Sequence, residues 1–166
     1  MKRFKLNLSS RYLVPLLLML FLLPAILPLL HSDSVPCTHD NSLHYYRITA
    51  MRDALRHGWL FSRWVPNLVL GYGYPFFNFR EPLPYLLGEF LAVLGLPLPL
   101  VLGLMYAASL VAAAWGAYAA ARDLFGERAA WITAMSYGLG PYLLLDMMRR
   151  GNLTESVALA LLPWLL

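Results

Sequence analysis

Charged residues are scarce in this chain of 166 residues, making up only 13 %, whereas hydrophobic residues make up 60 %. An ordinary soluble domain has about a quarter of its residues charged, so this composition indicates a membrane protein. The formal net charge is only +4 and no nucleic-acid-binding motif is present. We therefore relate the basic pI to membrane orientation and anionic lipid rather than to nucleic acid.

Cysteine is nearly absent, because Cys37 is the only one in the sequence. No disulfide can form within the chain, and the cysteine count does not indicate a redox compartment. The residues before it, Ser34-Val35-Pro36, are a poor lipoprotein cleavage signal.

Long apolar runs predict transmembrane helices. The first covers residues 12–30, is long enough to cross a hydrocarbon core of about 30 Å, and follows Lys2, Arg3, Lys5 and Arg11. These cations place the N-terminus in the cytoplasm. A cleaved signal peptide is the alternative, but the run is long for one and no convincing cleavage site follows it. Prolines within the run predict kinks.

Further apolar segments follow an outer loop at 31–81. They are a re-entrant or interfacial helix at 82–94, spans at 100–121 and 129–145, and a truncated span at 156–166. Gly103 and Gly116 give the 100–121 span a surface for close helix packing, and Gly138, Gly140 and Pro141 predict a bend in the next. We expect an all-α membrane protein, a multispanning helical bundle in the cell membrane, of which this chain is the N-terminal part.

The outer loop holds an amphipathic helix at about 41–57 that Gly58 ends. Asp40, His44 and Arg47 are spaced i, i+4 and i+7, which places them on one face of it. Beyond Gly58 lies an ordered loop rich in aromatic residues, as expected near a membrane interface. The predicted topology puts four more charged residues on the same outer side: Asp146, Arg149, Arg150 and Glu155.

The motifs of this loop resemble those of a known family. They are Asp40-x3-His44-x2-Arg47, Gly58, Arg63-Trp64-x-Pro66, Gly71-Tyr72-Gly73-Tyr74-Pro75-x-Phe77-x-Phe79, Pro82-Leu83-Pro84-Tyr85, Arg150-Gly151-x3-Glu155 and Leu162-Pro163. The chain resembles prokaryotic multispanning membrane proteins with a "6-pyruvoyl-tetrahydropterin synthase-related" domain, which are similar to YfhO-like and GT-C glycosyltransferases. Family members usually carry an aromatic residue and a proline where this chain has Arg80-Glu81.

The resemblance implies a GT-C-like fold and transfer of a sugar from a polyprenyl-phosphate donor to a glycan, lipid or protein acceptor of the cell envelope. Asp40, in the first outer loop, would act as general base or bind a divalent metal, Mg or Mn, together with His44. Glu155, and less surely Asp146, would be the second acid. Cations stabilise the departing phosphate, and the candidate substrate-binding residues are His44, Arg47, Arg63, Tyr72, Tyr74, Arg149 and Arg150.

The pterin label does not predict an activity here. A pterin synthase is expected to be soluble with a zinc site of three histidines, whereas the four histidines of this chain lie on a loop between membrane spans.

Each candidate also has a purely structural interpretation. Asp40 can cap a helix, the arginines can anchor lipid headgroups, Glu155 can simply favour the start of a helix, and the aromatic residues can belong to the interfacial belt. A non-catalytic protein of the same fold, either a lipid-linked-sugar transporter or an assembly scaffold, is therefore the competing function. A transferase requires Asp40 and Glu155 to converge near a cavity, and a transporter would carry more polar residues within its spans.

Overall fold

The computed structural model describes residues 8–30, 32–59 and 63–166, and for residues 8–12 it describes the backbone only. Within these residues the secondary structure is mostly helical, and β pairing is limited to an isolated bridge between Val65 and Tyr74. The predicted all-α class is confirmed. Lys2, Arg3 and Lys5, the cations on which the predicted cytoplasmic N-terminus depends, lie outside the described residues.

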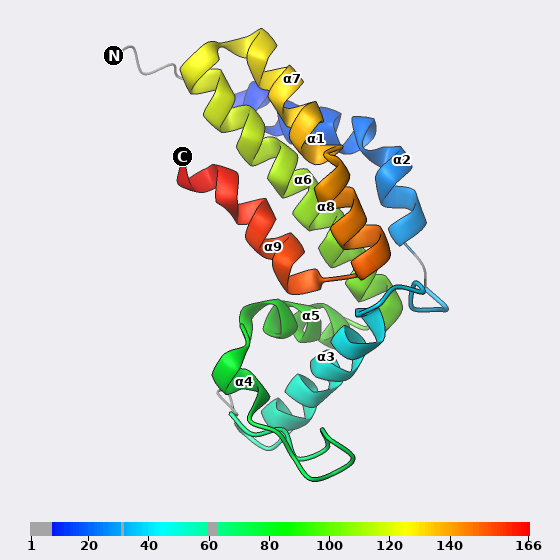
Figure 1. Cartoon of the computed structure of the whole chain (residues 1–166). Coiled ribbons are helices and arrows are strands. Elements are labelled where there is room, and N and C mark those ends of the chain that lie inside the picture. Colours follow the sequence, from blue (N-terminus) through cyan, green and yellow to red (C-terminus); the bar gives the residue numbers. More distant parts are fainter. Residues whose placement is uncertain (1–7, 31, 60–62) are drawn as a thin grey trace.

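The axis of the molecule is α6 (Leu98–Phe125), an uninterrupted apolar helix. α7 (Glu127–Gly138) runs back along it, and α9 (Leu153–Leu161) packs against its other side (Figure 1). Glycines permit these close approaches, because a Cβ on Gly103 would lie 2.0 Å from the Leu29 carbonyl oxygen and one on Gly116 would lie 2.6 Å from Trp164 Nε1. The predicted small-residue surface of this segment is thus used in packing.

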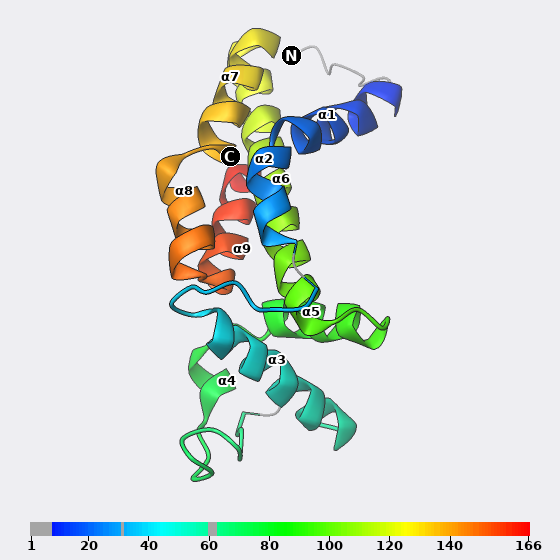
Figure 2. The same cartoon turned by 90° about the vertical axis from the view of Figure 1, so that its right-hand side faces the viewer.

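The predicted span at 12–30 is not one continuous helix, which corrects the sequence interpretation. It consists of α1 (Leu8–Phe21), α2 (Leu23–Ile26) and a 3₁₀ turn, η1 (Leu27–Leu29). Figure 2 shows α1 lying across the direction of α2. Pro24 and Pro28 explain the breaks, because proline lacks a backbone N–H and its ring clashes with the preceding turn.

The predicted spans at 129–145 and 156–166 are also interrupted. α7 ends at Gly138, and after Leu139 and Gly140 the chain resumes as α8 (Pro141–Leu145) and the π-helix η2 (Asp146–Arg150). α9 passes into a 3₁₀ turn, η3 (Leu162–Leu165), that contains Pro163. Among the described helices, α6 alone is long and apolar enough to cross a membrane, so a multispanning bundle is not established.

A second layer lies beyond the N-terminal end of α6 (Figures 1 and 2). It is formed by α3 (Asn41–Arg56), α4 (Phe76–Phe79) and α5 (Leu83–Val93). The bounds of α3 and α5 agree closely with the helices predicted at 41–57 and 82–94. The side chain of Ile48 packs against Gly88, and Arg52 Nε lies 2.9 Å from both carboxylate oxygens of Glu89, so α3 and α5 are held together by apolar and ionic contacts.

Candidate functional site

Two segments that are distant in sequence join where the second layer meets the bundle. The backbone N–H groups of His39 and Asp40 donate hydrogen bonds to the carbonyl oxygens of Arg149 (3.2 Å) and Arg150 (2.9 Å). Gly151 allows this approach, because its φ is 67° and a Cβ there would lie 2.1 Å from Thr38 Oγ1. The start of α3 is thereby fixed to the end of the π-helix.

A buried hydrogen-bond network centred on α6 supports the junction. The hydroxyl of Tyr106, on α6, lies 2.7 Å from Asn41 Oδ1 and 2.6 Å from the Gly151 carbonyl oxygen. A hydroxyl has one proton, so it donates to one of these two acceptors at a time. The Asn41 amide in turn donates to the Pro36 carbonyl at 3.3 Å. α6 thus holds both segments in one arrangement.

Asp40 occupies the N-cap position of α3, but its side chain makes no capping hydrogen bond. Thr38 Oγ1 accepts the N–H of Asn41 instead, at 3.2 Å. Asp40 is half-buried, and within the described part of the chain its carboxylate takes part in no hydrogen bond or ion pair. The capping interpretation therefore does not fit, and the carboxylate is available to accept a proton.

His44 is buried and makes two hydrogen bonds. Its Nε2 accepts the backbone N–H of Leu153 at 3.2 Å, and its Nδ1 lies 3.1 Å from Tyr85 Oη. Because Nε2 is an acceptor, the proton of the neutral ring is on Nδ1, which donates to Tyr85. Burial, reinforced by the charge of Arg47, lowers the pKa of His44 to about 4.

Tyr85 is the centre of this second network. Its hydroxyl oxygen accepts from His44 Nδ1 and, at 3.3 Å, from Arg47 Nη1. The Arg47 guanidinium also lies 4.7 Å from the ring centroid of Phe76, within the range of a cation–π contact. Burial raises the pKa of Tyr85 above its usual range. Arg47 is thus oriented by Tyr85 and Phe76.

A third group of polar side chains surrounds Arg150. Its Nη1 lies 2.9 Å from Asp146 Oδ1 and 3.0 Å from Glu155 Oε2. Asp146 is fully buried and also accepts from Ser156 Oγ at 3.1 Å, while Glu155 accepts a hydrogen bond from the hydroxyl of Tyr142. Asp146 and Arg150 are the first and last residues of the π-helix η2, and π-helices frequently occur at functional sites.

Some of the predicted site residues lie together at the junction, and others lie apart from it. Arg150 connects the backbone of Asp40 with the side chain of Glu155, because its carbonyl oxygen accepts the Asp40 N–H and its guanidinium pairs with the Glu155 carboxylate. Arg63 and Tyr72 are exposed on the loop after α3 and do not join them. Arg149 is exposed beside the junction and has no ion pair among the residues described. Arg150 already balances two carboxylates, which makes it a poor phosphate ligand.

The predicted metal pair does not fit the geometry. Both ring nitrogens of His44 are used in hydrogen bonds with Tyr85 and Leu153, whereas a metal ligand must offer an open nitrogen lone pair. Within the described residues no three acids, histidines or cysteines gather as a metal-binding group. We therefore assign no metal to Asp40 and His44.

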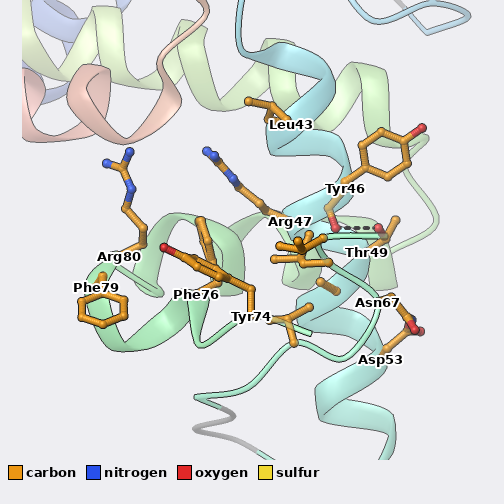
Figure 3. Close-up of a pocket in the computed structure, with 14 residues that line it drawn as sticks. Leu43, Tyr46, Arg47, Thr49, Asp53, Asn67, Tyr74, Phe76, Phe79 and Arg80 are labelled. Carbon is orange, nitrogen blue, oxygen red and sulfur yellow. Dashed lines mark hydrogen bonds between the residues drawn. The ribbon is translucent and has the colours of Figure 1, made fainter. Parts of the chain in front are cut away.

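A groove opens next to this junction, between α3 and residues 65–80 (Figure 3). It has a volume of about 730 Å³ and is lined by Arg47 and Tyr74, which were predicted to bind substrate, and by Arg80. Arg80, Tyr85 and Tyr106 were not among the site residues predicted from the sequence. The signal for Arg80 was its departure from the motif that the chain resembles, and Tyr85 ends the Pro-Leu-Pro-Tyr motif.

Comparisons with known proteins give no name to this arrangement. No family model, curated protein or solved structure matches the chain. The resemblance to GT-C enzymes remains a prediction from motifs, and the function has to be inferred from the site itself.

Proposed function

We propose that this chain is part of an integral-membrane, GT-C-like glycosyltransferase that moves a sugar from a polyprenyl-phosphate donor to a cell-envelope acceptor on the outer side of the membrane. The observation that carries the proposal is that Asp40, whose carboxylate has no hydrogen-bond or ion-pair partner among the described residues, is fixed through its backbone to Arg150, the ion-pair partner of Glu155. A scaffold has no need to bring these groups together.

The surface of the bundle supports a multi-pass position in the cell membrane. Large apolar side chains remain exposed on several helices other than α6, including Phe21 (62 %) on α1 and Ile132 (70 %) on α7. Exposed apolar surface on this scale favours contact with lipid or with other protein. In this proposal the interrupted helices cross the bilayer as stacked segments beside α6, with the N-terminus in the cytoplasm, and η2 and α3 lie outside.

The proposed role of each side chain depends on whether it already has a hydrogen-bond or ion-pair partner. Asp40 accepts the proton of the acceptor hydroxyl while the acceptor oxygen attacks the anomeric carbon of the donor. The bond between that carbon and the phosphate oxygen breaks, and polyprenyl phosphate leaves with its negative charge facing Arg149. Glu155 and Asp146, paired with Arg150, hold the junction rather than exchange protons.

The experiment uses the protein in lipid vesicles with a panel of polyprenyl-phosphate sugars. Asp40→Asn keeps the shape of the side chain but removes the base, so transfer should fall by about two orders of magnitude or more. Asp33→Asn, at an exposed aspartate of the same loop, is the matched control and should retain transfer.

Two results would count against the proposal. If wild-type protein transfers no sugar from any donor in the panel, the non-catalytic scaffold or transporter becomes the better account. If wild-type protein transfers sugar and Asp40→Asn matches it, another group is the base.

A further inference from the structure

The groove beside the junction has aromatic walls and a cationic end. Tyr46, Tyr74 and Phe79 line it with partly exposed rings, and Phe76 lies beneath. Its volume of about 730 Å³ falls within the range of about 300–1,000 Å³ that is usual for ligand sites. Figure 3 shows Arg47 and Arg80 on opposite sides of the groove with both guanidinium groups directed toward the same end.

These two guanidinium groups are not neutralised by direct pairing. In the part of the chain that is described, neither Arg47 nor Arg80 has a carboxylate within ion-pair distance. Glu81 is a nearby acid; burial opposes its ionisation, but a hydrogen bond with Thr154 and the charges of Arg80 and Arg47 bring its pKa below the usual range. The groove's own carboxylate, Asp53, lies at the other end, away from the two guanidinium groups (Figure 3), so the end beside Arg47 and Arg80 is positive.

Arg47 is also pre-oriented for an anion. Its guanidinium lies over the ring of Phe76 and donates one hydrogen bond to Tyr85, which leaves further N–H donors of the planar group unused. A guanidinium held in this way binds carboxylate or phosphate in a bidentate manner with little further loss of side-chain entropy.

We propose that the groove binds an acidic glycan, a sugar chain bearing carboxylate or phosphate groups, and that this glycan is the acceptor; this role as acceptor rests on the proposed transferase function. The rings offer flat apolar faces for the C–H faces of sugar units, and Arg47 and Arg80 pair with the acidic substituent. The aromatic walls and the cationic end of the groove thus each meet one feature of such a ligand.

The position of the groove favours a water-soluble acid over a lipid phosphate. Its walls come from α3 and residues 65–80, which lie beyond the end of α6 and outside the apolar bundle (Figure 1). Its cationic end faces the junction, because Arg47 contacts Tyr85, which contacts His44, which in turn contacts Leu153 at the start of α9. A glycan bound here therefore extends from the water phase toward the junction between the start of α3 and the start of α9.

The test measures binding without any sugar donor, so that it does not depend on turnover. The protein in nanodiscs is titrated with tetragalacturonate and, separately, with the fully methyl-esterified form of the same tetrasaccharide, which keeps the sugar rings and linkages but has neutral methyl esters in place of the carboxylates. Hydrogen bonds to a charged acceptor are stronger than those to a neutral ester, so the acid should bind at least about tenfold more tightly than the ester.

Variants connect this preference to the groove. Arg47→Gln/Arg80→Gln should bind acid and ester alike, and Arg80→Gln alone, at an exposed residue, should lose part of the preference without affecting folding. Tyr74→Ala should weaken both ligands. Arg128→Gln, at an exposed arginine on the far end of the bundle, should leave binding unchanged.

Four outcomes would overturn the inference. The first is equal binding of acid and ester by wild-type protein, and the second is a charge preference that survives in Arg80→Gln and in the double variant. The third is displacement of the acid by farnesyl phosphate at much lower concentration, with the same dependence on Arg47 and Arg80, which would make this a lipid-phosphate site. Sugar transfer to neutral acceptors alone would overturn only this inference and leave the transferase proposal standing.

Discussion

The backbone N–H of Leu153 donates a hydrogen bond to Nε2 of His44 across 3.2 Å. This bond connects the start of α9 to the first turn of α3 and requires the imidazole to be neutral. Protonation of Nε2 would place two donors face to face at the junction. The contact therefore ties the stability of the junction to pH.

Stability should fall in mild acid because of His44. Its pKa in the folded protein is lowered from 6.5 to about 4, chiefly by burial. Below pH 6.5 the unfolded chain takes up a proton that the folded chain does not, so stability decreases as pH falls through the window from 6.5 to 4. The full effect is about 3 kcal/mol at most.

Thermal unfolding in detergent at pH 7, 6 and 5 measures this dependence. The midpoint of wild-type protein should drop with each step, and His44→Gln should have a lower midpoint at pH 7 but a flatter profile. An equally steep profile in His44→Gln would show that other groups cause the acid sensitivity.

Removing the Tyr85 hydroxyl should destabilise the protein by about 1–3 kcal/mol. Tyr85→Phe leaves the Nδ1–H of His44 buried without an acceptor, and that is the usual penalty for such a group. Tyr72→Phe is the matched control, because that side chain is 84 % exposed and its loss should leave stability nearly unchanged. The comparison is made by thermal melting, and equal midpoints for the two variants would refute the role of Tyr85.

Gly151→Ala should disturb the junction more than a glycine substitution elsewhere. The new Cβ would clash with Thr38, and the backbone at this position has a φ of 67°. Gly58→Ala is the control, because its φ of 79° is also left-handed but no atom lies within 4 Å of the added Cβ. Both variants incur backbone strain of about 1 kcal/mol. Only Gly151→Ala should also reduce sugar transfer, and similar losses in both would show that the close contact is unimportant.

Glu89→Gln should weaken the packing of α3 on α5. The carboxylate is buried, with a 6 % exposed side chain, and breaking a buried pair leaves a charge uncompensated. Arg52 is partly exposed at 28 %, which reduces the expected loss to about 1–3 kcal/mol. Asp123→Asn breaks the exposed pair with Arg122 and should cost less than about 1 kcal/mol. A Glu89→Gln variant as stable as Asp123→Asn would contradict this account.

The sequence is most informative where local rules decide the structure. The periodic apolar residues of α3 and the stop at Gly58 predict the helix closely, and the long apolar run predicts α6. The interruptions of the other helices follow from prolines and glycines that the sequence shows. Their consequence is that, among the helices of the described residues, α6 alone is long and apolar enough to cross a membrane. This depends on how far each break turns the chain, which local rules do not predict.

The candidate site is only partly predictable for the same reason. The predicted membrane topology is enough to expect Asp40 and Glu155 on the same side of the membrane, because each follows a predicted span that runs outward. It cannot show that Arg150 balances Asp146 and Glu155, because this depends on a π-helix that has no clear sequence signal. Nor can it show that His44 has no open nitrogen, since Tyr85 and Leu153 are far from it in sequence. Pairings over long separations are set by packing.

The central structural claim is the contact between the start of α3 (residues 38–41) and the end of the π-helix (residues 149–151). Cross-linking in the membrane tests this contact most directly. Cysteines are placed at His39 and Arg149, which are exposed and joined by a backbone hydrogen bond, in protein whose own exposed Cys37 is changed to serine. A short bismaleimide should join them rapidly within one chain. The control pair, His39→Cys with Arg128→Cys at the opposite end of α6, should stay unlinked. Failure of the first pair to react, or equal reaction of both, would contradict the site described here.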